Sequence, residues 1–511
     1  MKTIKEPLFF LLGWCLFQIS LGWLSYLDLP PFGMHQGAQA DRASIAFNYF
    51  SESWNFFLPR VMEDRNANGI VGLEFPIIQY ITAIFYKLFG FHNQTYRLVV
   101  GIIVFFGHFA AWKIISQFAQ NTIHRIAILG LWVLSPLMCF YTFNYLPDLP
   151  SMAFSIISYA FFFKFYYEKK SKFYYLFLIF IGLSSLVKIT NLIHLIAVVA
   201  IMLFKNRFAT KKMEYSKTNM WISIIPILFV LTWYKYANYL THQTNNFHFL
   251  QSIHPPSNLA EFFENSRFAI NTWIDSLYPR LYLCILLIFY LITIIVSRKK
   301  MTLIGILSII TLLGYLSVFT LFNKQFKYHD YYQTLFYSIF LFILIWLYEQ
   351  TNKFIISTRK TNLKCGLNLG MLILVGFNYS HSKRILSATF DFGNYYCQNA
   401  VNVKPSDFEL LKSWLDKNIP KNKQLLIGFD PSPNTTLYLL HRKGIRIAPD
   451  FSDQLAIDLI KEKLKSNKNV APIFVCNDTN LLNKLPKLKS MLGKPIHRVS
   501  VFNIYKIPMF Y

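Results

Sequence analysis

Apolar runs of about 20 residues recur along the first three quarters of the chain, with short polar stretches between them. A run of this length crosses roughly 30 Å of hydrocarbon as a helix at about 1.5 Å per residue. We interpret eleven of the runs as membrane spans, and thus predict a polytopic α-helical membrane protein. The predicted spans cover residues 8–27, 97–119, 125–145, 149–167, 173–187, 191–204, 219–240, 280–297, 302–322, 331–348 and 365–380.

A further apolar run, residues 75–91, is ambiguous, and the charge of the connections decides it. Four connections together hold 15 Lys and Arg against 3 Glu, and such basic connections stay on the cytoplasmic side. They are residues 168–172, 205–217, 298–300 and 349–364. With Lys2 and Lys5 before the first span, this bias places residues 28–73 outside only if residues 75–91 do not cross. We therefore expect an interfacial helix at 75–91, a cytoplasmic N-terminus and an extracytoplasmic C-terminus.

From residue 382 onward, helix-like and strand-like segments alternate. Residues 382–511 are therefore predicted to form a small external α/β domain after a transmembrane module of residues 1–381, whose first external loop is 28–96. Expected helices cover residues 406–418 and 453–465, and expected strands cover 423–430, 471–477 and 500–507.

Composition agrees with a membrane protein. Hydrophobic residues make up 54% of the chain and charged residues only 15%, against about 25% in soluble domains, so a soluble, disordered or coiled-coil protein is excluded. The net charge of +26 reflects cations that hold loops in the cytoplasm, and we predict no nucleic-acid partner. The sequence has no nucleotide-binding motif.

Cysteine spacing indicates neither a zinc site nor a disulfide framework. Only Cys397 and Cys476 fall in the water-exposed domain, and the sequence leaves open whether they pair. We predict no metal ligands and name no cofactor; whether a divalent metal takes part also stays open.

The candidate catalytic residues are two aspartates on the predicted outer face. Asp41 lies near the start of a short amphipathic helix, where a carboxylate could accept a proton from a substrate hydroxyl. The alternative is a helix-terminal charge stabilised by the macrodipole. Asp148 opens a span between Pro147 and Pro150, and a helix-capping role is the alternative there.

Cations on the same face are candidates for binding a phosphate. Lys188 interrupts an apolar hairpin on the external side, so it either snorkels to the surface or binds an anion such as a lipid phosphate. The segment NKQFKYHDYY at 323–332 adds Lys327 and His329. An aromatic belt explains its tyrosines, Tyr331 and Tyr332, but not the adjacent cations. Weaker candidates, more typical of surface or interfacial positions, are His35, Arg97 and Arg280.

Five loose motifs, in order along residues 1–350, resemble the GT-C superfamily of membrane glycosyltransferases, especially the aminoarabinose transferase and protein O-mannosyltransferase branches. Glu74 stands before a proline-led helix that ends in the LFG of residues 88–90, and Arg97 opens the next span. Asp148 in YLPDLPSMAF, Lys188 in SLVKITNL and the KYHDYY of 327–332 complete the set. Where aminoarabinose transferases have a lysine before the proline, this chain has Phe75, which argues against aminoarabinose transfer itself.

The resemblance implies an inverting transfer of a sugar from a polyprenyl-phosphate-linked donor to a lipid, glycan or protein acceptor, in a multi-pass protein of the cytoplasmic membrane, at its outer face. The resemblance implies a catalytic role for Asp148, and the chemistry it implies suits Asp41, the base proposed above, as the second catalytic residue. Donor phosphate contacts are expected from Lys188, His329, Lys327 and Arg97, and substrate contacts from Glu74, Tyr331, Tyr332 and His35. Membrane lipids are the other expected partners. The alternative function is a transporter or flippase of lipid-linked sugars, since helices with buried charges also serve transport.

Overall fold

The structure is a computed structural model that describes residues 2–65, 67–207, 217–246, 249, 253–298, 301–358 and 361–508. The greater part of the predicted basic connection 205–217, and residues 299–300 and 359–360 of two others, lie outside the described residues.

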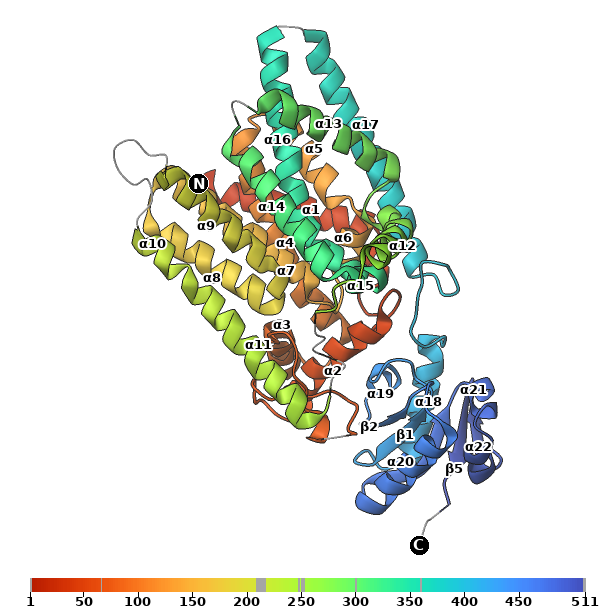
Figure 1. Cartoon of the computed structure of the whole chain (residues 1–511). Coiled ribbons are helices and arrows are strands. Elements are labelled where there is room, and N and C mark those ends of the chain that lie inside the picture. Colours follow the sequence, from red (N-terminus) through yellow and green to blue (C-terminus); the bar gives the residue numbers. More distant parts are fainter. Residues whose placement is uncertain are drawn as a thin grey trace.

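Helices make up most of the chain up to Thr389, and they pack into a single bundle (Figure 1). The α-helices of this part are α1 Lys2–Ser20, α2 Gln36–Ser51, α3 Ile77–Phe89, α4 Asn93–Phe118, α5 Thr122–Val133, α6 Pro136–Tyr141, α7 Asp148–Glu168, α8 Ser171–Val187, α9 Leu192–Arg207, α10 Lys217–Ile222, α11 Ile224–Thr244, α12 Leu259–Leu277, α13 Arg280–Ser297, α14 Leu303–Leu321, α15 Asn323–Tyr328, α16 Thr334–Thr358 and α17 Thr361–Thr389. Short 3-10 turns are η1 Trp23–Ser25, η2 Ala67–Gly69, η3 Ile189–Asn191 and η4 Asp330–Gln333.

Within the described residues, six helices are long and apolar enough to cross a membrane. They are Asn93–Phe118, Asp148–Glu168, Thr218–Thr244, Arg280–Ser297, Leu303–Leu321 and Asp330–Thr358. This confirms a helical, multi-pass membrane protein and agrees with six of the predicted spans, whereas the total of eleven stays a prediction. Two further predicted spans, at 173–187 and 191–204, correspond to shorter apolar helices.

The predicted span at 125–145 is not one helix. It consists of α5 and α6, which are separated at Leu134 and Ser135. Pro136 disfavours helical geometry at the residue before it and has no N–H to donate, so the first helix ends and Ser135 caps the second. Apolar residues continue across the break, which is why the hydrophobic pattern did not reveal it.

The ambiguous run at 75–91 forms α3, a helix of 13 residues. At about 1.5 Å per residue it is about 20 Å long, too short to cross a bilayer of roughly 30 Å. Its length therefore supports the predicted interfacial helix. The N-cap position is Pro76, as the proline-led pattern indicated.

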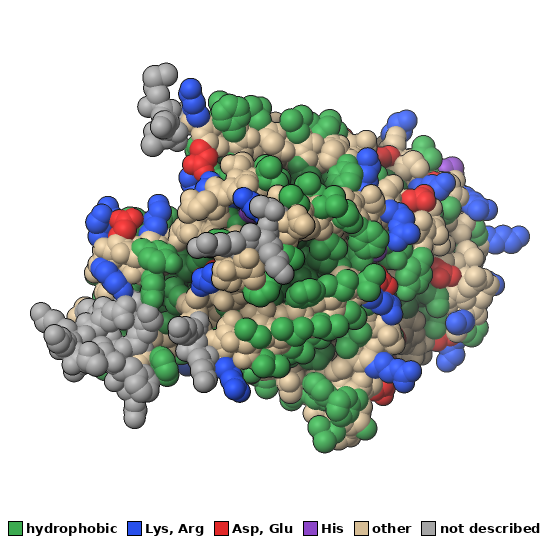
Figure 2. All heavy atoms as spheres, turned by 90° about the horizontal axis from the view of Figure 1, so that it is seen from above, with side chains coloured by type: hydrophobic (Ala, Val, Ile, Leu, Met, Phe, Trp, Pro, Cys, Tyr) green, Lys and Arg blue, Asp and Glu red, His purple; other side chains and the backbone are tan. Residues whose placement is uncertain are grey.

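The end of the bundle where α16 gives way to α17 lies opposite the C-terminal domain, and α2 and α3 lie at the end facing that domain (Figure 1). Seen from above that view, hydrophobic side chains are exposed over much of the surface, and Lys and Arg side chains are spread mainly along its margins (Figure 2). Exposed apolar side chains such as Leu281, Ile295 and Val296 on α13 agree with contact to lipid.

After α17 the chain forms a small α/β domain, in which the described residues give a five-stranded sheet of order β2-β1-β3-β5-β4. β1 pairs in parallel with β2 and β3, and β5 is antiparallel to β3 and β4. The strands are β1 Gln424–Gly428, β2 Gly444–Ile447, β3 Val470–Cys476, β4 His497–Val499 and β5 Phe502–Lys506, and the helices are α18 Pro405–Asn418, α19 Thr435–Leu439, α20 Asp453–Ser466, α21 Thr479–Asn483 and α22 Pro486–Leu492. All five elements expected from the sequence are present. Both Cys397 and Cys476 are free thiols.

The sheet of this domain continues the hydrophobic core of the bundle. Leu425 and Ile427 belong to one cluster with the buried residues of the membrane helices, whereas Leu426, between them, belongs to the cluster under α20 and α22. Alternate residues of a strand point to opposite faces, so one face of the sheet packs toward the bundle. An edge contact adds to this docking, because Asp64 N donates to the carbonyl of Gly444 at the start of β2 (2.8 Å).

Candidate active site

A cavity of about 370 Å³ lies where α2, the segment before α3, the ends of several membrane helices and the C-terminal domain meet. Its lining comes from α2, the segment before α3, the α8–α9 turn, α11, the segment around η4, and the loop after β1. The lining residues are Gly37, Ala38, Asp41, Arg42, Glu74, Lys188, Ile189, Thr190, Tyr234, Phe249, Phe322, His329, Tyr331, Tyr332, Pro431, Ser432 and Pro433.

One wall of the cavity holds a two-pronged ion pair. Arg42 donates from Nε to Glu74 Oε1 (2.9 Å) and from Nη2 to Glu74 Oε2 (3.2 Å). Although burial alone disfavours the carboxylate, the adjacent Arg42 guanidinium leaves the pKa of Glu74 below its usual value. A fork of this kind is geometrically rigid, so it fixes α2 against the segment leading into α3.

Asp41 precedes this arginine on α2 but is held differently. Its Oδ1 accepts a hydrogen bond from Nδ2 of Asn434 (2.8 Å), and its Oδ2 lies 3.8 Å from Nη1 of Arg42. Burial raises the pKa of the Asp41 carboxyl to about 6, although Arg42 and Asn434 favour the ionised form. A carboxylate with this pKa is mostly ionised at neutral pH and is a stronger base than an exposed aspartate.

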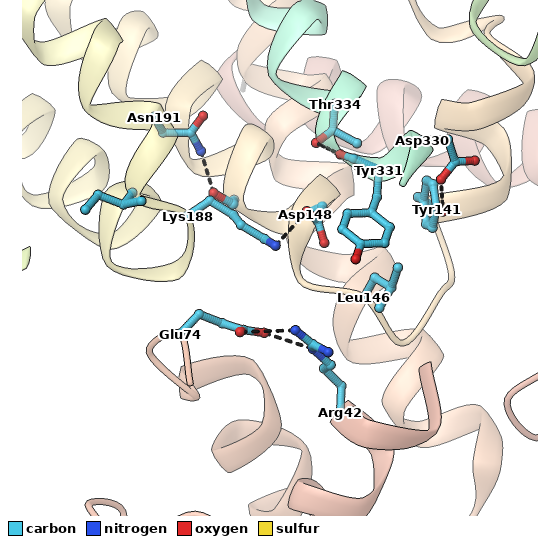
Figure 3. Close-up of polar contacts among 12 residues, drawn as sticks. Arg42, Glu74, Tyr141, Leu146, Asp148, Lys188, Asn191, Asp330, Tyr331 and Thr334 are labelled. Carbon is cyan, nitrogen blue, oxygen red and sulfur yellow. Dashed lines mark hydrogen bonds and ion pairs between the residues drawn. The ribbon is translucent and has the colours of Figure 1, made fainter. Parts of the chain in front are cut away.

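Across the cavity lies a second ion pair. Lys188 Nζ lies 2.9 Å from Asp148 Oδ1, and it lies over the rings of Tyr331 and Tyr332 at 5.3 and 5.5 Å. Figure 3 shows this pair on one side, the Glu74–Arg42 pair on the other, and the Tyr331 ring between Asp148 and Tyr141. An ammonium group has three N–H donors and the contact with Asp148 uses one, so Lys188 retains donors for a ligand.

A serine and asparagine network holds α7 and α8 together beside this pair. Asn191 Nδ2 donates to Ser151 Oγ (2.5 Å) and to Ser184 Oγ (2.8 Å), and Ser155 Oγ lies 2.7 Å from Ser184 Oγ. Asp148, Ser151 and Ser155 share one face of α7 because they are three and four residues apart. The network therefore fixes the positions of both partners of the Lys188–Asp148 pair.

His35 lies behind the cavity wall at the N-cap of α2. Its Nε2 lies 2.9 Å from Asp330 Oδ1, and the same oxygen accepts from the hydroxyl of Tyr141 (2.7 Å). The His35 ring packs edge-on against Tyr331 with centroids 5.1 Å apart.

Burial lowers the pKa of His329, which lines the cavity, to about 4, so this imidazole is neutral at pH 7.

The structure brings together most of the residues proposed from the sequence. Six line the cavity, namely Asp41, Glu74, Lys188, His329, Tyr331 and Tyr332. Asp148 and His35 lie directly behind it, in contact with lining residues. Lys327 and Arg97 do not line it.

Arg97 is fully buried and bound to the backbone. Its guanidinium donates to the carbonyls of Leu29 (3.0 Å), Pro30 (3.1 Å) and Phe143 (2.6 Å) and lies over the Tyr145 ring. These contacts tie the segment between α1 and α2 to α4 and to the α6–α7 connection. We therefore leave Arg97 out of the proposed donor site.

Lys327 likewise makes its contacts away from the cavity. Its Nζ pairs with Glu264 Oε1 (3.1 Å) on α12 and lies over the Phe268 ring. We leave it out of the proposed donor site as well.

Phe75 takes no part in the cavity. Its ring packs against Trp233 and Phe56, each with centroids 4.9 Å apart. The aromatic side chain thus replaces a cation with apolar packing, and Lys188 is the lysine that lines the cavity.

Several lining residues were not singled out from the sequence. Arg42 was identifiable, since it adjoins Asp41 in a segment already of interest. Tyr234 lies within an apolar run, where a single tyrosine does not stand out, and Ser432 belongs to the proline-rich loop of the distant C-terminal domain. Asn434, in the same loop, does not line the cavity but donates to the lining residue Asp41. Within the described part of the chain, no group of three or more His, Cys, Asp and Glu side chains could hold a metal ion.

The chain is similar in fold to known proteins. Residues 74–233 match the family model described as dolichyl-phosphate-mannose-protein mannosyltransferase. No curated protein sequence matches the chain. Among solved structures, ArnT from Cupriavidus metallidurans in the apo state aligns with a TM-score of 0.60 at 10% identity, covering 96% of this chain and 97% of that one.

ArnT bound to undecaprenyl phosphate gives the same TM-score at 11% identity, covering 96% of this chain and 98% of that one. The chain has the GT-C fold. An Archaeoglobus fulgidus oligosaccharyltransferase, also of the GT-C fold, aligns with a TM-score of 0.56 at 11% identity, covering 96% of this chain and 73% of that one. The GT-C resemblance of the five sequence motifs is thus confirmed at the level of fold.

Proposed function

We propose that the chain is an inverting glycosyltransferase that moves a sugar from a polyprenyl-phosphate-linked donor to a lipid, glycan or protein acceptor at the outer face of the cytoplasmic membrane. The GT-C fold, the match to the mannosyltransferase family model and the undecaprenyl phosphate bound by the related ArnT support this proposal. The observation that carries it is the placing of the Asp41 carboxylate and the Lys188 ammonium in the same cavity.

In the proposed reaction, the acceptor oxygen attacks the anomeric carbon while the bond from that carbon to the phosphate oxygen breaks. The electron pair of the broken bond leaves with the polyprenyl phosphate, and the configuration at the anomeric carbon inverts. Asp41 takes the proton of the acceptor hydroxyl, and its raised pKa suits it to this role at neutral pH.

The leaving phosphate gains negative charge, which a fixed donor group stabilises. Lys188 is the proposed cation that stabilises this phosphate. It is held in place by Asp148 (2.9 Å) and by the two tyrosine rings. His329, neutral at pH 7, supplies an N–H donor from the same wall. Asp148 is proposed to position Lys188 and does not itself contact the donor, because it lies behind the lining residues.

The placement of the site on the outer face rests on charge. The cavity is built at the end of the bundle that faces the C-terminal domain, and the α16–α17 junction, within the basic connection 349–364, lies at the opposite end (Figure 1). Basic connections stay cytoplasmic, which supports an extracytoplasmic site.

The test is a transfer assay with purified protein in proteoliposomes, a panel of radiolabelled polyprenyl-phosphate sugars, and membrane lipid, glycan or peptide acceptors. We expect one donor to be used, with inversion, and Asp41→Asn to lower the rate about 10² to 10⁴-fold, the range typical of a lost general base. Asp391→Asn, which removes an exposed carboxylate, is the matched control. Full transfer by Asp41→Asn would overturn the assignment of the base. Facilitated movement of labelled donor across the bilayer without transfer would favour the flippase.

A further inference from the structure

A loop of the C-terminal domain forms part of the cavity wall. The chain leaves β1 at Gly428, and Pro431, Ser432 and Pro433 then line the cavity beside α2. The approach is close, since a Cβ on Gly37 would lie 2.7 Å from the Cβ of Ser432. Glycine at position 37 thus lets the loop come into direct contact with the helix that carries Asp41.

This loop is held in a defined shape. The Asp430 carboxylate accepts from the backbone N–H groups of Ser432 (2.9 Å) and Thr436 (2.7 Å). Arg446 on β2 donates to the carbonyls of Asp430 (3.0 Å) and Pro431 (3.1 Å). Phe429 has a φ of 65°, a left-handed conformation that is uncommon for an aromatic residue and requires such support from its surroundings.

At the end of the loop, Asn434 joins two segments of the membrane module. Its Oδ1 accepts from the backbone N–H of Glu63 (2.8 Å), and its Nδ2 donates to Asp41 Oδ1 (2.8 Å). A backbone N–H can only donate, so it determines which end of the amide is the oxygen, and the NH₂ group must face Asp41. Asn434 is itself fully buried, so it has no water to exchange for these partners.

We propose that Asn434 is a positioning residue that holds the Asp41 carboxylate toward the acceptor, and that the C-terminal domain is therefore a component of the active site. The proposal rests on the proposed function in so far as Asp41 is the base. It goes further by giving a catalytic reason for the contact between the two parts of the chain.

The substitution Asn434→Asp tests this role because it separates the two contacts. The new side chain keeps an oxygen to accept from the Glu63 N–H, so docking of the loop is retained. It replaces the NH₂ donor with a carboxylate facing Asp41, and a like charge at that distance raises the pKa of one member of the pair. Thr435→Val is the matched control, since it changes the neighbouring residue without touching Asp41.

With full-length protein in proteoliposomes, we expect Asn434→Asp to lower kcat about 10²-fold at pH 7, with donor KM unchanged. The acid limb of its pH–rate profile should move up by about one pH unit or more. Thr435→Val should keep the wild-type profile. Wild-type kcat and an unshifted profile in Asn434→Asp would overturn the proposal, as would an equal loss in Thr435→Val.

A second measurement does not depend on transfer. The difference in Tm between proteins with Asp and with Asn at position 41, followed against pH, reports the titration of Asp41. Its midpoint should move upward when Asn434→Asp is present. If no donor is used by the wild-type protein but this midpoint moves, the proposed function fails while the contact stands; if the midpoint does not move, Asn434 does not control Asp41.

Discussion

Replacing Asp41 by asparagine should make the protein more stable at neutral pH while it lowers the rate of transfer. Burial raises the pKa of this carboxyl from 3.8 to about 6, which means that the folded state holds the ionised form less favourably than the unfolded state does. At about 1.36 kcal/mol per pKa unit, the shift corresponds to about 3 kcal/mol. Asparagine carries no charge and has the same shape, so it removes this cost.

The sign of the effect depends on pH. Below about pH 4 the carboxyl is protonated in both states, so Asp41→Asn and wild type should differ least. Between about pH 4 and pH 6 the unfolded carboxyl loses its proton while the folded one retains it, and wild-type stability falls as pH rises. Above about pH 6 the difference should level off near its full value.

The assay is thermal unfolding of the purified protein in detergent from pH 4 to pH 8, with Asp391→Asn as the control for loss of a surface charge. We expect Asp41→Asn to raise Tm by a few degrees at pH 7 and by little at pH 4. A variant that is less stable than wild type over the whole range would refute the reasoning, because it would show that the ionised carboxylate is a net stabilising group in the folded protein.

Three further predictions concern other parts of the chain. Lys188→Ala should raise the KM for the sugar donor, lower kcat, or both, measured at fixed acceptor concentration. Lys188→Arg should recover part of the loss, because it keeps the charge but not the geometry. A change in acceptor kinetics alone would assign the lysine to the acceptor site. Arg97→Lys should lower the free energy of unfolding by about 3 kcal/mol or more, because the three carbonyls are bound by three separate nitrogens of a planar guanidinium and the single nitrogen of a lysine cannot reach all of them. Any folded fraction should keep its donor KM. A single cysteine at the exposed position Leu455, in a background without the six native cysteines, should react with an impermeant reagent only from the outside, and labelling from the cytoplasm alone would overturn the proposed topology.

The sequence predicted those features that depend on residues close together in the chain. Apolar length predicted the long helices, the proline before residue 77 marked the start of α3, and alternating patterns located β1, β3 and β5. The positive charge of the connections, counted along successive spans, predicted that Asp41, Lys188 and His329 lie on one side of the membrane. The structure brings all three to one cavity.

What could not be predicted depends on contacts between distant segments. From the sequence, Arg97 was expected to bind a phosphate, whereas in the structure it binds three backbone carbonyls. Every residue has a backbone carbonyl, so the sequence cannot indicate these partners. The contact between Asn434 and Asp41 joins residues 393 positions apart, so no local pattern indicates it. The division into α5 and α6 was hidden because the residues around Pro136 are as apolar as a continuous span.

The separation of these two residues along the chain has a consequence for biosynthesis. Under the proposed topology, Asp41 is delivered to the outer face soon after the first span is inserted, whereas Asn434 arrives only after the whole bundle has been made and the C-terminal domain has been exported and folded. An unfinished or prematurely terminated polypeptide would thus carry the membrane helices and the cations without an oriented base. Under the proposed function, full activity would therefore require the C-terminal domain to be synthesised, exported and folded first.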